Sequence, residues 1–249
     1  MRFPILVFLF AFIGLSLCVK LGIFLRSRIK LLDKDDRDDF TLVQASTLTL
    51  MGIIIGFSFS MSVSRYDQRK IYEEEEANAI GTEYLRLDLL PAANTAARKQ
   101  LLSKYLDHRI AWYSTRDLDE ITRINRDTAR VQNELWATVE KASEGQPAAV
   151  VSLTVSGLND VINSQGYTQA AWLNSIPPGA WILMFTVAAF GSVLIGLGAH
   201  KQSAFLFLVL PLVVSLALFL IADLDSPRGG LIRVRPQNLL SLSQSLNPR

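Results

Sequence analysis

The sequence predicts an all-α membrane protein with four transmembrane helices and a helical extramembrane domain inserted between the second and third helices. Half of the 249 residues are hydrophobic, and they are concentrated in four blocks. Between the second and third blocks, apolar residues recur at three- and four-residue spacing, which is typical of helices that pack along one face. No part of that segment alternates as a strand would, so we expect helices throughout.

Each apolar block is long enough to cross the hydrocarbon core, which takes about 20 helical residues. The predicted spans are residues 3–25, 41–63, 179–199 and 203–222. Lys20 is the one charge in the first span, and it is close enough to the end to reach the interface. The first block could instead be a secretory signal, but it is long for a signal core and lacks a small-x-small cleavage site. We therefore interpret it as a membrane helix.

Four crossings place both termini and the inserted segment on one side of the membrane. We divide the chain into residues 1–63 (helices one and two), 64–177 (the inserted domain), 178–223 (helices three and four) and 224–249 (a C-terminal tail). The tail has a short amphipathic turn around Leu239, Leu240 and Leu242, and it could lie on the membrane or on a neighbouring subunit. Lys and Arg are nearly balanced between the two sides, so the positive-inside rule does not decide the orientation.

The sequence predicts no enzyme, no metal site and no cofactor. His108 and His200 fall on opposite sides of the membrane in this topology, and Cys18 lies inside the first block. No phosphate-binding glycine loop or nucleophile elbow is present. Asp223 and Asp225 follow the last span without a matching acid or base. The net charge of +2 gives no reason to expect a nucleic-acid partner.

The second block has two stripes on one helix. It continues without a proline into the charged segment "SRYDQRKIYEEEE", which predicts one helix that leaves the membrane and ends before Pro91. Small residues that allow close helix packing recur every four residues at Gly52, Gly56, Ser60 and Ser64. A bulkier stripe runs beside them at Thr49, Ile53, Phe57 and Met61. The bulky stripe either packs in an ordinary bundle or forms rings around the central axis of an oligomer.

Two charged features beyond this span are open to two interpretations. Arg65 either concentrates anions at a pore mouth or pairs with Asp67 or with an acid on a neighbouring helix. The four consecutive glutamates at 73–76 form either a solvated helix face or a ring of acids in an assembly. The residue types alone do not choose between these alternatives.

The segment "GFSFSMSVSRYDQ" resembles the second helix of bestrophins. The pairs Gly56-Phe57 and Arg65-Tyr66 match in type and spacing. More of the chain resembles the bacterial bestrophin-like membrane family, a domain of unknown function, through "SRYDQRK", "EANAIGTEYLRLDLLP", "LNDVI" followed by "IPP", and "LDSPRGGLIRV". Together these segments cover most of residues 50–240 in the right order.

The resemblance implies a four-helix subunit of the inner (plasma) membrane with cytosolic termini and a cytosolic helical domain. It also implies a homo-oligomer, a pentamer around an anion pore whose neck is lined by the second helix. Carried over by motif, the neck positions are Phe57, Ile53 and Thr49, and Thr49 makes one ring polar. Arg228 stands where the family has an aromatic residue. The stretch "DLDSPRGG" has fewer acids than the calcium clasp of animal bestrophins.

These inferences predict an oligomeric ion channel, anion-conducting and constricted at helix two, with membrane lipid and inorganic ions as partners. The expected pore-lining residues are Thr49, Ile53, Phe57, Met61, Ser60 and Ser64, with Gly52 and Gly56 as helix-packing residues and Arg65 at the pore mouth. The alternative is a non-conducting scaffold or signalling protein that acts through its cytosolic helices. Its candidate contact residues are Trp112, Trp136 and Trp172, although tryptophans in helical domains more often belong to the core.

Overall fold

The computed structural model describes residues 4–28, 34–199 and 206–246, and within these ranges it contains helices and no strand. The helices are α1 (Pro4–Arg28), α2 (Lys34–Arg86), the 3₁₀ helix η1 (Leu87–Leu89), α3 (Thr95–Ser114), α4 (Leu118–Ser143), α5 (Ala148–Leu173), α6 (Pro178–Gly198), α7 (Leu206–Asp225) and α8 (Gln237–Leu246). They form two compact units. Unit 1 comprises Met1–Tyr66 and Ser175–Arg233, and unit 2 comprises Asp67–Asn174 and Val234–Arg249.

Four helical segments of the described chain are long and apolar enough to cross a membrane. They are Pro4–Arg26, Arg37–Leu89, Ala148–Gly198 and Phe207–Asp225, and they confirm the four apolar blocks. The predicted starts at residues 3 and 203, and the turn with His200, lie outside the described residues.

Helix α2 is continuous from Lys34 to Arg86, as its lack of proline predicts. Its 53 residues span about 80 Å at 1.5 Å per residue. The hydrocarbon core is only about 30 Å thick. The predicted span, residues 41–63, is long enough to cross it. These residues belong to unit 1, whereas α2 from Asp67 onward belongs to unit 2.

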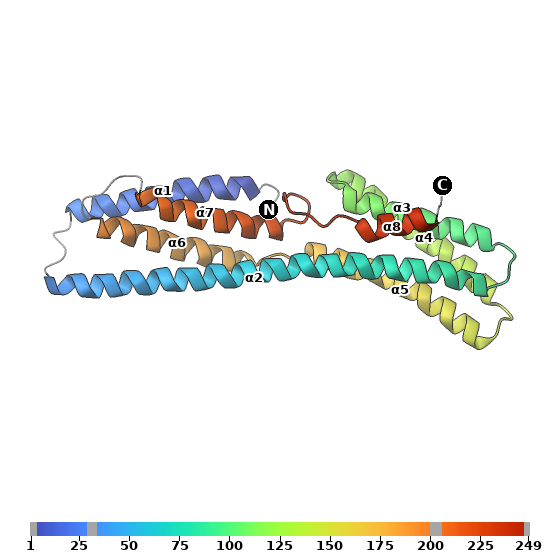
Figure 1. The fold of residues 1–249 in the computed structure, drawn as a ribbon. Helices are drawn as coiled ribbons and strands as arrows, with labels where there is room; N and C mark the ends of the chain where they lie inside the picture. Colours follow the sequence, from blue (N-terminus) through green and yellow to red (C-terminus); the bar gives the residue numbers. More distant parts are fainter. Residues whose placement is uncertain (1–3, 29–33, 200–205, 247–249) are drawn as a thin grey trace. The chain divides into compact units, whose positions relative to one another are not determined.

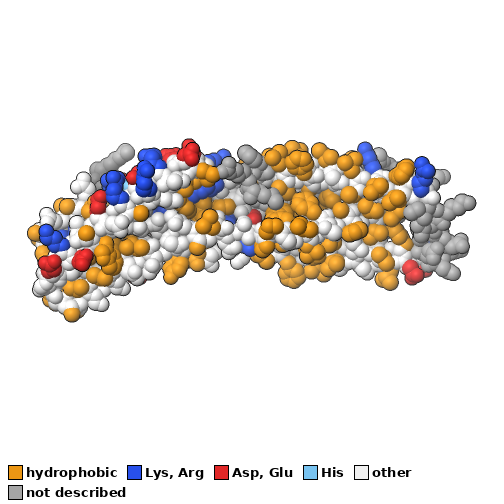
Figure 2. Space-filling view, turned by 180° about the vertical axis from the view of Figure 1, so that it is seen from behind, with side chains coloured by type: hydrophobic (Ala, Val, Ile, Leu, Met, Phe, Trp, Pro, Cys, Tyr) orange, Lys and Arg blue, Asp and Glu red, His pale blue; other side chains and the backbone are white. Residues whose placement is uncertain are grey.

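The core of unit 1 forms where α1, α6 and α7 pack together and α2 lies along them (Figure 1). Leu15, Met184 and Leu218 are almost completely buried there. On the face shown in Figure 2, hydrophobic side chains are frequent over these helices, whereas more of the charged side chains lie over unit 2. An apolar surface of this kind suits contact with lipid.

Helices α1 and α6 come into backbone contact at two glycines, Gly22 and Gly196. A Cβ added to Gly22 would lie 2.9 Å from the Cα of Gly196 and would collide with the carbonyl oxygen of Val193. A Cβ on Gly196 would collide in the same way with the carbonyl oxygen of Val19. The two backbones touch because neither position has a side chain.

Unit 2 is built around the polar part of α2. Ile80 on α2, Leu102 on α3, Leu135 on α4 and Leu158 on α5 are fully buried, which agrees with the predicted apolar stripes. Trp112 and Trp172 also belong to this core, whereas Trp136 is 40% exposed. A short connection separates α4 from α5, with Gly145 in the left-handed region at φ 73°.

From Val234 onward the C-terminal tail packs within unit 2 of its own chain, whereas residues 224–233 belong to unit 1. Its helix α8 contacts α3 and buries Leu239 completely. The carboxylate of Glu73 accepts hydrogen bonds from the backbone N–H groups of Asn238 (2.9 Å) and Leu239 (3.0 Å), and from the side-chain amide of Asn238 (2.7 Å). An acid at the N-terminus of a helix also complements the helix dipole.

Replacing Glu73 with alanine is expected to loosen α8. The change removes the acceptor for three N–H donors at the start of the helix, which we expect to cost about 1–3 kcal/mol of docking free energy. Hydrogen exchange of residues 237–246 should therefore become faster. The matched control is Glu74→Ala, because Glu74 is exposed on the same helix. Equal protection of α8 in the two variants would contradict the anchoring role.

Candidate functional site

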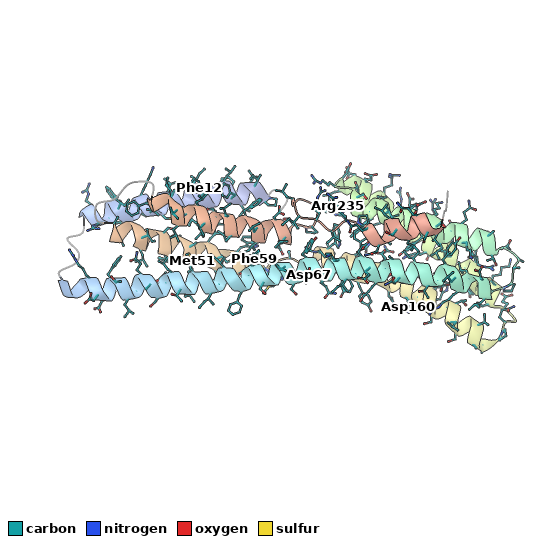
Figure 3. The ribbon with its side chains drawn as sticks, in the orientation of Figure 1. Phe12, Met51, Phe59, Asp67, Asp160 and Arg235 are labelled. Carbon is teal, nitrogen blue, oxygen red and sulfur yellow. The ribbon has the colours of Figure 1, made fainter. Side chains whose placement is uncertain are left out.

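One face of α2 packs into unit 1. Leu48, Ile54 and Ile55 contact its core, and Met51 is buried on the side that faces α6 (Figure 3). Ser62 is also buried, and its hydroxyl donates to the carbonyl of Ser58 at 3.0 Å. The packed positions on this face recur every three or four residues, as expected for one side of a helix. The other side of α2 is therefore left uncovered.

The uncovered side of α2 carries every predicted pore-lining and helix-packing residue. At 100° per residue, Thr49, Ile53 and Ser60 lie about half a turn from Met51. All the positions concerned are exposed in the single chain: Thr49, Gly52, Ile53, Gly56, Phe57, Ser60, Met61 and Ser64. A Cβ at Gly52 or Gly56 would have nothing within 4 Å. The small residues therefore pack no helix of the chain's own described part, and their packing role stays a prediction.

Helix α2 is the least covered of the four apolar segments. Only 6% of its most apolar 18-residue window is buried, compared with 22% for the segment in α1 and 44% for that in α7. Exposure to lipid explains Ile53 and Phe57, but it does not explain the exposed hydroxyls of Thr49, Ser60 and Ser64. In hydrocarbon these hydroxyls would find partners only on their own helix, whereas water or a second protein surface could satisfy them.

Arg65 lies at the end of the apolar part and pairs with an acid on a neighbouring helix. Its Nη1 lies 3.0 Å from Oδ1 of Asp225, the last residue of α7. Both oxygens of Asp225 also accept the backbone N–H of Ile176 at 3.0 Å, just before α6. One buried carboxylate thus joins α2, the start of α6 and the end of α7 within unit 1.

Asp223 is bound in the same way by the segment that follows α7. Its Oδ1 accepts the N–H of Leu231 at 2.7 Å and its Oδ2 accepts the N–H of Ile232 at 2.8 Å. The turn depends on Gly230, where a Cβ would lie 2.5 Å from the carbonyl oxygen of Asp223. The two aspartates that lacked partners in the sequence are therefore structural anchors. Their position at the end of an apolar helix was the available signal, because buried carboxylates need donors.

The interpretation of residues 73–76 as a solvated face is wrong for two of the four glutamates. Glu74 and Glu75 are exposed, but Glu73 and Glu76 are buried. Glu76 forms a fully buried ion pair with Nε of Arg109, and it accepts hydrogen bonds from Tyr113 (3.3 Å) and Thr168 (3.2 Å). Burial, and then the charge of Glu76, raise the pKa of Tyr113. These contacts link α2, α3 and α5 within unit 2.

In the part of the chain that the structure describes, no group of three or more His, Cys, Asp or Glu side chains could hold a metal ion. The exposed polar and apolar residues on the uncovered face of α2, at residues 49–64, make this face the candidate functional surface. The Arg65–Asp225 pair lies at its end.

Several solved structures have a similar fold. A bacterial Bestrophin homolog from Klebsiella pneumoniae matches with a TM-score of 0.69 and 16% identity over 96% of each chain. A variant of that protein matches with a TM-score of 0.70 and 16% identity over 96% of this chain and 97% of the other. A structure described as a membrane protein matches with a TM-score of 0.67 and 16% identity over 95% and 98%. This likeness is one of fold.

No relative was found among curated proteins. The family profile described as Bestrophin-like domain, however, matches residues 12–239, which is most of the sequence. The resemblance inferred from the sequence motifs is thereby confirmed. The chain belongs to the Bestrophin-like family of membrane proteins.

Proposed function

We propose that the protein is an oligomeric ion channel in which the uncovered face of α2 lines the conduction path. The observation that carries this proposal is the direction of Thr49, Ile53, Phe57 and Ser60, all exposed on the side of α2 away from the core of unit 1. A ring of copies related by rotation would bring these faces around a common axis.

The two kinds of residue on this face have different tasks in such a path. Ile53 and Phe57 form rings that narrow it and exclude water, since hydrophobic constrictions gate by dewetting. Ser60 and Ser64 supply hydroxyls that can replace part of the hydration of an ion at little cost in buried charge. Thr49 makes the ring on the far side of Ile53 polar.

Further features of the proposal are supported by the family. Solved structures with this fold include proteins described as bacterial Bestrophin homologs, and the resemblance favours a homo-pentamer that conducts anions. The resemblance also favours unit 2, which α2 enters at Asp67, as the cytosolic helical domain of a protein in the inner (plasma) membrane. Membrane lipid and inorganic ions are the partners.

Replacing Phe57 with alanine is expected to increase the current through the purified protein in planar bilayers several-fold, because the narrowest apolar ring is widened. Phe10→Ala is the matched control. Phe57 is 72% exposed and Phe10, on α1, is 73% exposed in the single chain. If both phenylalanines face lipid, their replacement should have the same effect.

Three outcomes are therefore separable. A rise in current with Phe57→Ala alone supports a pore at α2. Equal currents in both variants and in the unmodified protein would show that α2 does not line the conduction path. No current under any voltage, pH or calcium concentration would reject the channel.

A further inference from the structure

A buried carboxyl group without a partner lies in unit 2, near the end of α2. Glu83 is 1% exposed, and in the described part of the chain neither of its oxygens has a hydrogen-bond partner. Glu73 and Glu76, by contrast, have donors for their carboxylates. Glu83 lies about 30 Å along the helix beyond residue 63, so it is well outside the membrane-spanning part.

The backbone of α5 covers this carboxyl at a glycine. A Cβ added to Gly157 would collide with Oε2 of Glu83 and with a guanidinium nitrogen of Arg86. Gly157 is itself buried. The absence of a side chain at this position therefore makes room for an acid that is almost completely buried.

The charged groups around Glu83 do not neutralise it. Arg86 lies one turn further along α2, but no ion pair or hydrogen bond joins it to Glu83 among the described residues. Asp160 lies one turn beyond Gly157 on α5 (Figure 3) and opposes ionisation. Helix α8 comes close through Leu242, which would lie 3.1 Å from a Cβ on Gly81, and α8 has no titratable side chain.

The nearby bases of α3, which packs against η1, are occupied by other acceptors. Arg98 donates to the carbonyl oxygens of Pro91 (2.7 Å) and Ala93 (3.1 Å). Lys99 pairs with Asp88 of η1 at 2.7 Å. These contacts leave the carboxyl of Glu83 without a compensating cation on α3.

A carboxylate in such surroundings is strongly disfavoured, and a buried acid takes up a proton instead. Burial raises the pKa of Glu83 from the ordinary 4.5 to about 8, with the charge of Arg86 acting against the shift and that of Asp160 adding to it. The uncharged acid fits beneath Gly157. The ionised form needs water, which the packing of α5 keeps out, or a closer approach of the Arg86 guanidinium.

We propose that Glu83 is a proton-binding site through which pH sets the stability of unit 2. The stabilisation is complete below the unfolded pKa near 4.5 and is lost as the pH rises through the folded value, because the folded state holds its proton more tightly than the unfolded state. The inference concerns unit 2 alone, and it holds whether or not the protein conducts ions.

The test compares hydrogen exchange of α5 amides around Gly157 in the full-length protein in detergent with exchange in the Glu83→Gln variant. Taking the ratio of the two at each pH cancels the intrinsic pH dependence of exchange. The opening equilibrium of the unmodified protein, relative to the variant, should rise about 100-fold between pH 6 and pH 9. The control Glu75→Gln removes an exposed acid from the same helix and should keep the full pH dependence.

Infrared spectroscopy gives a second measurement, which does not depend on the stability of the variant. The unmodified protein should show the band of a protonated, buried carboxyl group at pH 6 that disappears above pH 8. Asp160→Asn should move this loss to lower pH, because it removes a negative charge near Glu83.

Two results would overturn the proposal. One is the absence of the carboxyl band at pH 6. The other is a Glu83→Gln variant that is less stable than the unmodified protein at pH 8, since that would show a paired carboxylate. Neither measurement uses conductance, so a failed channel recording leaves this inference standing, and the reverse is also true.

Discussion

Replacing Arg109 with methionine is expected to destabilise unit 2 by about 3–5 kcal/mol. The side chains of Arg109 and Glu76 are both 0% exposed, so the change leaves a buried carboxylate with only the hydroxyls of Tyr113 and Thr168 as donors. Arg109 also stacks over the ring of Trp112 at 4.7 Å, and that contact is lost too. Thermal unfolding in detergent, followed by tryptophan fluorescence, measures the effect.

The control is Arg123→Met on α4. Arg123 and Glu120 pair at 3.4 Å, but their side chains are 61% and 43% exposed. The free energy of unfolding should therefore fall by less than about 1 kcal/mol. The double variant Glu76→Gln with Arg109→Met should lose less stability than the two single variants lose in sum, because it leaves no unpaired charge. Equal losses in Arg109→Met and Arg123→Met would show that the buried pair contributes no more than a surface one.

Replacing Gly22 with alanine is expected to separate α1 from α6 and to destabilise unit 1 by about 3 kcal/mol. The new methyl group would meet the backbone of α6 at Val193 and Gly196, and backbone atoms cannot move aside as a flexible side chain can. Gly196→Ala should have the same effect from the other helix. The melting temperature in detergent is the measurement.

Gly14→Ala, on the same helix α1, is the control, since a Cβ there has nothing within 4 Å. Alanine has the higher helix propensity, so this variant should be neutral or more stable by up to about 1 kcal/mol. If the two glycine variants of α1 melt alike, the close contact between α1 and α6 is not present in the protein.

The parts of this fold that could be predicted from sequence are those that depend on local pattern. The four apolar segments follow from composition, and the continuity of α2 follows from the absence of proline between residues 41 and 86. The outward direction of Thr49 and Ile53 could not be predicted, because it depends on which side of α2 contacts α6. The sequence shows the two stripes of α2, but it does not show which side of the helix packs against the core of unit 1.

The contacts that could not be predicted join residues far apart in the chain. Glu73 and Glu76 look alike in a run of four glutamates, yet one binds α8 and the other binds Arg109 on α3. The same holds for Gly22, whose partner on α6 is Gly196. In each case a single residue type at helical spacing has many possible partners, and only the three-dimensional packing selects one.

The place of α8 has a consequence for how the protein is made. Unit 2 is assembled from residues before α6 and from Val234 onward, so the two apolar helices α6 and α7 are synthesised before its last element. Until the ribosome has passed Leu239, the carboxylate of Glu73 has no donors from α8 and the site that buries Leu239 is empty. We therefore expect this unit to reach its native state only after the membrane helices have been delivered to the insertion machinery, with chaperones able to bind it in the meantime.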